Sequence, residues 1–512
     1  MSRLPLSFCG KMTHPLKKLA GQTAVYGLSS IVGRLLNYLL TPLYTTKFLH
    51  TEYGVVTELF AYSGLLLVLL TYGMETAYFR FSQKYPKGKD VFSTAALPIL
   101  ITSSIFMLCM VLCAQPLANA LDYANHSEYI IFFTLIVGFD SITAVPFAKL
   151  RKENKALRFA VYKFINIGLN ISLNLFFILL CPYVLKNHPE SFFQHIYNPS
   201  VGIGYIFIAN LAASSLTLLL FLPEFLRLNF RISIPLLKKL LAYGLPLLVV
   251  GLVGMINEVA DRIMLKHLLR VPAGVSNARE YVLGQIGIYG ANYKLSVLIV
   301  LFIQAFRYAA EPFFFGQARK SDAKKIYALT MRYFVILGLC IVLGIMFYLD
   351  IVKYFISNAN YWQGLYVVPV LLVAGLFMGI VFNLSIWYKL TDKTHFGIVI
   401  AGSGALITLL MNFLLIPKIG FLGSAWTHLV CNFVMMLLSF ALGRKYYRID
   451  YPLKDLFMYF LLAALLYVAG RFHGLQGTYK YLINTLLLLL FMVYILKKEK
   501  IFPLLLRKIK RG

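Results

Sequence analysis

The chain has 512 residues, of which 60% are hydrophobic, 15% aromatic and only 13% charged. Soluble globular domains carry about 25% charged residues, so this composition excludes a soluble protein and indicates a polytopic membrane protein. The formal net charge of +29 comes from basic residues scattered over many short loops. Such scatter does not fit a nucleic-acid-binding surface and points to membrane topology.

Apolar segments long enough to cross a bilayer, roughly 20 residues each, follow one another along the chain. They predict an all-α polytopic membrane protein with about 14 transmembrane helices. Several segments are longer than the membrane requires, which suggests tilted helices. The predicted spans are 21–48, 53–82, 91–116, 128–149, 157–185, 201–226, 238–265, 282–315, 326–349, 362–388, 394–416, 421–442, 454–470 and 479–496.

Lysine and arginine residues gather in the N-terminal tail, in alternate loops and in the tail that follows Lys497. The intervening loops carry few of them, including Lys186, Lys266, Arg270 and Lys418. The positive-inside rule therefore predicts that both termini lie in the cytoplasm, and an even number of helices agrees. The basic C-terminal tail either binds anionic lipid, binds a biosynthetic partner, or simply anchors the last helix.

An internal repeat divides the chain into two related halves. The stretch from Glu52 to Phe79 recurs as Ile288 to Phe315, and each copy has a Tyr-Gly pair near its start and a glutamate before an aromatic-rich end. Tyr26-Gly27-Leu28-Ser29 corresponds in the same way to Tyr243-Gly244-Leu245-Pro246. Internal repeats of this kind are typical of transporters.

The sequence lacks the signatures of nucleotide-driven or metal-dependent chemistry. It has no Gly-x-x-x-x-Gly-Lys-Ser/Thr loop and no Asp-x-Asp pair. The six cysteines include no Cys-x-x-Cys, and the nine histidines are dispersed. Cys109 and Cys113 lie one turn apart without a neighbouring histidine, which favours packing over metal binding. We therefore predict a transporter rather than an enzyme, with no metal and no cofactor.

Polar and charged residues recur on single faces of several predicted helices. Each would cost about 2.5 to 3.5 kcal/mol at the bilayer centre, so such residues should face a cavity or a partner. The stripes are Ser30, Arg34, Asn37, Thr41 and Thr45; Glu58, Tyr62, Gly73, Thr76 and Arg80; Lys163, Asn166, Asn170 and Asn174; Asn210, Ser214 and Thr217; Asn257, Glu258, Asp261 and Arg262; and Tyr289, Tyr293, Ser296, Arg307 and Glu311. They predict a polar cavity between two bundles.

Several stripe residues have a simpler interpretation. Glu258 with Arg262, and Arg307 with Glu311, stand four residues apart and could form local ion pairs. Asn170 and Asn174 could be hydrogen-bonding contacts between helices. Arg34 and Lys163 have no carboxylate within one turn of their own helices, which makes them the better candidates for ligand contact.

Acidic residues in the spans are candidates for coupling transport to an ion. Asp140 precedes a predicted helix break at Val145-Pro146, where it is either protonatable or a capping residue. Prolines and glycines inside the helices, notably Pro42, Pro246, Gly251 and Gly254, are candidate bending points. The full set of ion-coupling candidates is Glu75, Asp140, Glu258, Asp261 and Glu311.

Three runs of sequence resemble a known family. Gly33-Arg34-Leu35-Leu36-Asn37 through Pro42-Leu43-Tyr44-Thr45 to Glu52-Tyr53-Gly54, Ile286 to Leu295, and Leu414 to Ala425 are similar to the polysaccharide and O-antigen flippases of the multidrug/oligosaccharidyl-lipid/polysaccharide (MOP) exporter superfamily. These matches lie in both halves of the chain. They are specific for the family and not for a substrate.

The resemblance implies two six-helix bundles related by an axis along the membrane normal, plus two C-terminal helices. It also implies multi-pass insertion in a bacterial inner membrane, with polysaccharide polymerase or other assembly proteins as partners. The implied regions are a cytoplasmic tail at 1–20, a bundle at 21–226, a cytoplasmic linker at 227–237, a second bundle at 238–442, an additional helix pair at 443–496 and a basic cytoplasmic tail at 497–512.

The implied activity is translocation of an oligosaccharide on undecaprenyl pyrophosphate from the cytoplasmic to the outer leaflet. Cationic side chains would then attract the pyrophosphate, while Asn and Tyr side chains would bond sugar hydroxyls. Protons or sodium could drive the cycle. The residues predicted to bind substrate are Arg34, Asn37, Arg80, Lys163, Asn170, Asn174, Lys294 and Arg307.

Three other functions are alternatives to translocation of a lipid-linked oligosaccharide. A drug or cation exporter of the same superfamily would need a cavity dominated by carboxylates, whereas acids and bases are nearly balanced here. A membrane polymerase or ligase would carry catalytic residues on a large outer loop, and the loops near 186–200 and 266–281 are short. A peptidoglycan-precursor flippase would share the fold and the pyrophosphate chemistry, so the sequence does not separate it from an oligosaccharide flippase.

Overall fold

A computed structural model describes residues 31–85, 90–230, 232–317, 320–391, 393–472 and 476–499. Within helices, the side chains of Asp90, Ala309, Glu311, Pro312, Phe315 and Gly316 are also outside the described set. The predicted tail 1–20, the repeat element Tyr26–Ser29 and most of the basic tail at 497–512 therefore lie outside the described residues.

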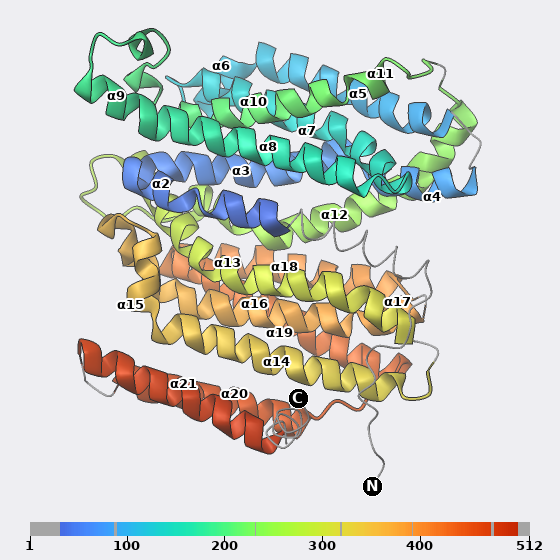
Figure 1. Cartoon of the computed structure of the whole chain (residues 1–512), viewed down its shortest axis with the longest axis vertical. Coiled ribbons are helices and arrows are strands. Elements are labelled where there is room, and N and C mark those ends of the chain that lie inside the picture. Colours follow the sequence, from blue (N-terminus) through green and yellow to red (C-terminus); the bar gives the residue numbers. More distant parts are fainter. Residues whose placement is uncertain are drawn as a thin grey trace, which may run out of the picture. The chain divides into compact units, whose positions relative to one another are not determined.

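Helices dominate the described residues, which contain no strand (Figure 1). Residues 31–38 are helical. The first half then contains α2 (Thr41–Lys47), α3 (His50–Thr71), α4 (Met74–Lys84), α5 (Asp90–Leu112), α6 (Ala114–Ala120), α7 (Ser127–Lys152), α8 (Ala156–Leu175), α9 (Cys181–Asn187), α10 (Gly204–Leu220) and α11 (Leu222–Phe225). The second half contains α12 (Ile234–Leu268), α13 (Ala278–Gln317), α14 (Ala323–Phe347), α15 (Leu349–Val352), α16 (Val368–Leu384), α17 (Ile386–Leu390), α18 (His395–Ile419), α19 (Phe421–Tyr446), α20 (Leu453–Phe472) and α21 (Thr478–Lys498).

Twelve helices of the described chain are long and apolar enough to cross a membrane. The predicted all-α polytopic membrane fold is therefore confirmed. The total of about fourteen spans stays a prediction. The first predicted span begins before the described residues, and the sixth corresponds to α10, a shorter apolar helix of 17 residues.

The chain forms two compact units that do not follow its order. Unit 1 comprises residues 1–38, 66–251 and 304–313, and unit 2 comprises residues 39–65, 252–303 and 314–512. The boundaries fall inside α3, α12 and α13, so each of these long helices contributes to both units. Each unit consequently contains segments from both sequence halves.

In unit 1, α7 is the central helix and packs against α5, α8 and α10. Its aromatic contacts include Phe147, whose ring meets the edges of Phe159 at 5.3 Å and Phe221 at 4.8 Å between centroids. The predicted helix break at Val145-Pro146 is wrong, because α7 runs from Ser127 to Lys152 with Pro146 inside it. Membrane helices tolerate an internal proline when neighbouring groups compensate for the lost hydrogen bond.

The Tyr-Gly pairs of the repeat lie at close helix contacts. In unit 2, a β-carbon added to Gly54 of α3 would collide with the carbonyl of Leu283 on α13. One added to Gly287 of α13 would collide with the carbonyl oxygen of His50, and one added to Gly290 with the side chain of Thr57. Small residues let helix backbones approach closely where no hydrophobic effect drives association.

A corresponding contact occurs in unit 1 at the break between α3 and α4. Tyr72 and Gly73 both have positive φ values, 31° and 71°, which costs a non-glycine residue backbone strain. A β-carbon on Gly73 would collide with the carbonyl oxygen of Gly244 in α12. The second repeated Tyr-Gly element, Tyr243-Gly244, therefore also lies at a contact between segments of the two sequence halves.

The additional helix pair α20 and α21 forms a hairpin that packs on α14 (Figure 1). Near one end, Arg332 of α14 lies 2.7 Å from both Asp455 and Glu499. Near the other end, Lys480 of α21 bonds Asp350, and this hydrogen bond lowers the pKa of the Asp350 carboxyl. Polar contacts therefore join the hairpin to α14 and to the following helix α15.

We expect Gly287→Ala to destabilise unit 2 by about 1–3 kcal/mol, since the added methyl group must displace backbone atoms. The matched control is Gly254→Ala in α12, where a β-carbon would meet nothing within 4 Å. That change should be neutral or stabilise the helix by up to about 1 kcal/mol. Thermal unfolding of the purified protein measures both, and equal melting temperatures for the two variants would contradict the packing argument.

Candidate functional site

Unit 1 contains a polar cavity of about 550 Å³. Residues from the 31–38 helix, α3, α4, α7, α8 and α10 line it, so six separate segments contribute. Its polar and charged lining residues are Asn37, Thr71, Glu75, Asp140, Thr143, Arg151, Lys163, Asn166, Asn170, Asn210, Ser214 and Thr217. The volume lies within the range of small-molecule sites, roughly 300–1,000 Å³.

An acid and a base from adjacent helices stand in this cavity. Asp140 of α7 accepts a hydrogen bond of 2.7 Å from the hydroxyl of Ser214 on α10. Lys163 of α8 places its ammonium 4.1 Å from the centre of the Phe147 ring, a cation–π contact. Asp140 and Lys163 attract each other electrostatically, yet they form no ion pair within 4.0 Å among the described contacts. Because Asp140 lies mid-helix, it is not a capping residue.

A second pair of opposite charges lies beside the first. Arg151, in the last turn of α7, bonds the carboxylate of Glu75 on α4. The predicted span 128–149 ends before Arg151, whereas α7 continues to Lys152 and includes it. The charged lining residues are then two bases and two acids, so the cavity is close to electrically balanced.

Side-chain amides connect α8 to α10 along the cavity wall. Asn166 donates to Thr217 at 2.9 Å, and Asn170 donates to Asn210 at 3.3 Å. Asn174 is fully buried and donates to Asn170 of its own helix at 2.8 Å. The predicted stripes on these two helices therefore face each other. Asn170 forms a hydrogen bond between helices, as one of the two interpretations of this residue predicted.

Of the other predicted substrate-binding residues, only Asn37 belongs to the lining of this cavity. Asn37 lines the cavity, whereas Arg34 is exposed on the same helix and does not. Arg80 is exposed, with its guanidinium 4.3 Å from the centre of the Tyr243 ring. Arg307 is exposed on α13, and Lys294 is half-buried on the part of α13 that belongs to unit 2.

Unit 2 contains a buried carboxylate with several donors. Asp261 of α12 is 1% exposed. Its Oδ2 accepts a hydrogen bond from the hydroxyl of Tyr289 at 2.6 Å and lies 3.0 Å from Nε2 of His428 on α19. Its Oδ1 accepts from the backbone amide of Arg262 at 2.9 Å. The three partners come from α12, α13 and α19, so this cluster joins three helices.

Arg262 does not form the local ion pair with Glu258 that was one interpretation of their spacing. The guanidinium of Arg262 lies 3.6 Å from the Asp261 carboxylate and donates to the backbone carbonyl of Glu258. It also stands 4.2 Å from the centre of the Tyr293 ring. The Glu258 carboxylate itself is exposed. The side chain of Glu311 lies outside the described residues, so its pairing with Arg307 stays a prediction.

A third assignment changes in the structure. Lys266 was counted among the loop cations, but it lies inside α12 with its side chain 7% exposed. Its ammonium is 2.9 Å from the carboxylate of Glu58 on α3, which is fully buried. Glu58 and Lys266 therefore form an internal ion pair of unit 2. Glu58 had been predicted to face a cavity, and Lys266 to lie in a loop that reports topology.

Sequence reasoning missed His428, because it considered the histidines only as dispersed residues. A signal was present, since Ser424, Thr427, His428 and Cys431 recur at helical spacing in an apolar helix. The same stripe test that found α8 and α10 would have found α19.

Comparison with known proteins places this arrangement in a class. The chain is similar to the lipid II flippase MurJ in an inward closed conformation, with a TM-score of 0.70 and 13% identity over 92% of this chain and 98% of that one. An inward-facing multidrug resistance MATE family transporter of the MOP superfamily gives a TM-score of 0.61 and 17% identity, over 81% and 94% of the two chains. The outward-facing conformation of a MATE family transporter gives 0.56 and 17%. The comparison with curated proteins gives no match.

The chain therefore shares the fold of these solved structures. The sequence profile described as polysaccharide biosynthesis protein matches residues 19–316, more than half of the chain. The chain belongs to the polysaccharide biosynthesis protein family.

We expect Lys163→Gln to destabilise the protein by about 1–3 kcal/mol, because it leaves the Asp140 carboxylate in the cavity without a nearby cation. Adding Asp140→Asn should recover most of this loss, since the charge is then removed from both sites. Thermal unfolding of the two single variants and the double variant measures the coupling. Lys84→Gln, at an exposed lysine of α4, is the control, and purely additive effects would exclude an interaction between Asp140 and Lys163.

Proposed function

We propose that this protein translocates an oligosaccharide linked to undecaprenyl pyrophosphate from the cytoplasmic to the outer leaflet of a bacterial inner membrane. It would serve surface polysaccharide or O-antigen biosynthesis and act by alternating access, with both termini in the cytoplasm. Polysaccharide polymerase or other assembly proteins would receive the product. The observation that carries the proposal is the unit 1 cavity, where amides and hydroxyls surround a cation in a chain of this family.

The cavity lining suits a sugar headgroup. Asparagine side chains both donate and accept hydrogen bonds, and hydroxyl groups do the same, which matches the hydroxyls of a sugar ring. Four asparagines and several hydroxyl residues line the cavity, namely Asn37, Asn166, Asn170, Asn210, Thr71, Thr143, Ser214 and Thr217. Asn174 would support this set by holding Asn170 from behind.

The pyrophosphate needs cations, and Lys163 supplies the first. Its ammonium is held by an aromatic ring and by attraction to Asp140 rather than by a close ion pair, so a phosphate can approach it. Arg34, Arg80, Lys294 and Arg307 are proposed as further contacts along the path. Outward movement of a net negative headgroup is favoured by about 2.3 kcal/mol per charge per 100 mV when the cell interior is negative.

Asp261 and His428 are the groups that we propose for proton coupling. A carboxylate and an imidazole at hydrogen-bond distance can pass a proton between them, and His428 lies 3.0 Å from the Asp261 carboxylate. The charged or titratable neighbours of this pair are Tyr289, Arg262 and Tyr293. Lys294 and Glu258 interact in turn with Arg262 and Tyr293. Sodium coupling through Asp261 is the alternative. Glu75, Asp140 and Glu311 remain further coupling candidates in the proposal.

A peptidoglycan-precursor flippase is the closest alternative function. The fold similarity to MurJ favours it, because that protein is described as a lipid II flippase. The family match favours polysaccharide biosynthesis. A cation-coupled drug exporter, as suggested by the MATE similarity, would fit poorly with a cavity lined by four asparagines.

The test is complementation in strains that each lack one native flippase. We expect the chain to restore surface polysaccharide in a strain without its O-antigen flippase, and Lys163→Ala to reduce this at least about tenfold, as lost charge-assisted contact predicts. Variants of equal abundance are compared by labelling of surface glycan. Arg34→Ala in the same assay measures the contribution of a cation outside the cavity.

Lys84→Ala is the control for this experiment, because Lys84 is exposed and does not line the cavity. Rescue of a strain without its peptidoglycan-precursor flippase, and not of the O-antigen strain, would move that alternative to first place. Drug or cation export without any glycan rescue would refute the flippase proposal.

Replacing His428 should alter how transport depends on pH. If the proton leaves and enters through the Asp261–His428 pair, His428→Gln should reduce the pH dependence of flipping, because a glutamine amide cannot take up and release a proton at that position. Reconstituted vesicles and a fluorescent lipid-linked sugar measure this. His195→Gln, at an exposed histidine of the 3₁₀-helix Phe192–His195 that follows α9, is the control. A sodium requirement with unchanged pH dependence in His428→Gln would favour the sodium alternative.

A further inference from the structure

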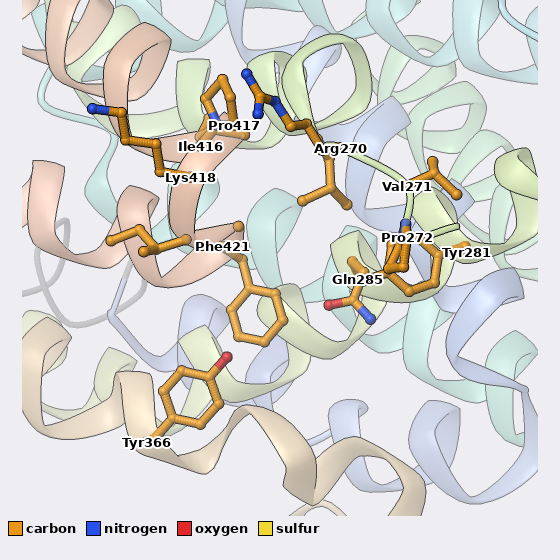
Figure 2. Close-up of a pocket in the computed structure, with 13 residues that line it drawn as sticks. Arg270, Val271, Pro272, Tyr281, Gln285, Tyr366, Ile416, Pro417, Lys418 and Phe421 are labelled. Atoms are coloured by element: carbon orange, nitrogen blue, oxygen red, sulfur yellow. The ribbon is translucent and has the colours of Figure 1, made fainter. Parts of the chain in front are cut away.

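Unit 2 contains a pocket of about 380 Å³ whose lining residues have no role in the function proposed above (Figure 2). It is built at one end of the unit, from the loop between α12 and α13, the first turns of α13, the turn between α18 and α19, and Tyr366 of the 3₁₀-helix Ala359–Val367. The cations of these loops, Arg270 and Lys418, belong to the sparsely charged set that the positive-inside rule places on the outer side.

The pocket has a positive electrostatic character. Arg270 and Lys418 line it, and neither forms an ion pair with a described carboxylate. No acidic residue is part of the lining. The nearest acid in sequence, Glu280, is held by Asn277 through its backbone amide at 3.2 Å and its carboxylate at 3.3 Å.

Aromatic and amide groups complete the wall. The Tyr366 and Phe421 rings stack with centroids 5.6 Å apart and an interplanar angle of 20°. Tyr366 is 53% exposed, so one face and its hydroxyl remain accessible. Figure 2 shows the Gln285 amide between the Phe421 ring on one side and Pro272 and Tyr281 on the other. The Lys418 side chain extends away from Arg270 in this view.

We propose that this pocket binds an anionic hydroxylated group, a carboxylate or phosphate beside hydroxyls, on the outer side of the membrane. Its source is an acidic sugar of the translocated glycan, because the exposed face of Tyr366 offers a surface on which a sugar ring packs, and Gln285 matches a sugar hydroxyl. This inference rests on the proposed function and deepens it, since it assigns acidic glycans as the substrate class. The headgroup of an anionic phospholipid has the same chemistry.

The test uses the full-length protein in phosphatidylcholine nanodiscs, with tri-galacturonic acid as the acidic probe and maltotriose as the neutral one. Isothermal titration should show that tri-galacturonic acid binds at least about tenfold more tightly than maltotriose. Arg270→Gln should remove this preference, and Arg270→Lys should retain part of it. Arg471→Gln is the matched control, because Arg471 is exposed and lies outside the pocket. Tyr366→Ala should weaken both probes.

A separate arm identifies the lipid source. In nanodiscs that contain phosphatidylglycerol, mass spectrometry of the intact complex should find bound phosphatidylglycerol lost in Arg270→Gln if the lipid headgroup is the occupant, and tri-galacturonic acid should then compete with it. This outcome would support the anion site and would identify a lipid headgroup, instead of the glycan, as its ligand. Equal binding of every probe to Arg270→Gln and to the unmodified chain would overturn the proposal, as would absence of binding to either.

Failure of the pocket and failure of the proposed function give different results. If Arg270→Gln binds like the unmodified chain while surface polysaccharide is still restored, the pocket proposal falls and the flippase proposal stands. If the anion preference depends on Arg270 but no glycan background is rescued, the pocket stands as an anion site and the flippase proposal falls.

Discussion

The hydrocarbon interior of a membrane supplies no hydrogen-bond partner, and this constraint determines how the polar residues of the protein are arranged. An unpaired polar group there costs several kcal/mol, so each must meet another protein group or a wet cavity. Asn166 and Asn170 of α8 meet Thr217 and Asn210 of α10. The Asp261 carboxylate is contacted by a tyrosine, a histidine and a backbone amide. The same contacts that satisfy these groups also hold the helices of each unit together.

Periodicity within one helix was therefore a reliable guide. The stripe on α8 and the stripe on α10 were both predicted from three- and four-residue spacing, and they face one another in unit 1. The repeated Tyr-Gly pairs were noticed as a sign of internal symmetry, and their physical role is close backbone contact, as at Gly54 and Gly244. These positions could be identified from the sequence because helical spacing and a repeated Tyr-Gly pair can each be recognised within a single segment.

Partners on different helices could not be predicted in the same way. Lys266 and Arg151 were counted with the loops, because charges near a predicted helix end look like topology signals. Their carboxylate partners, Glu58 and Glu75, come from segments distant in the sequence. Arg262 was matched with Glu258 by spacing, yet its carboxylate contact is Asp261. Spacing reports which residues share a helix face, whereas the choice of partner depends on which helices pack together.

The electrical balance of the unit 1 cavity bears on how an anion would be bound and released. Lys163 is attracted to Asp140, and Arg151 bonds Glu75. Each cation of the empty cavity therefore has a carboxylate nearby, which offsets the free-energy cost of placing a charge in a low-dielectric environment. Under the proposed function, an entering phosphate would compete with Asp140 for the Lys163 ammonium, and part of its binding energy would offset the lost attraction. A site with unopposed cations would bind a pyrophosphate tightly and release it slowly. For a protein that must discharge its cargo on the other side of the membrane, an internal carboxylate that re-forms its attraction to Lys163 favours release.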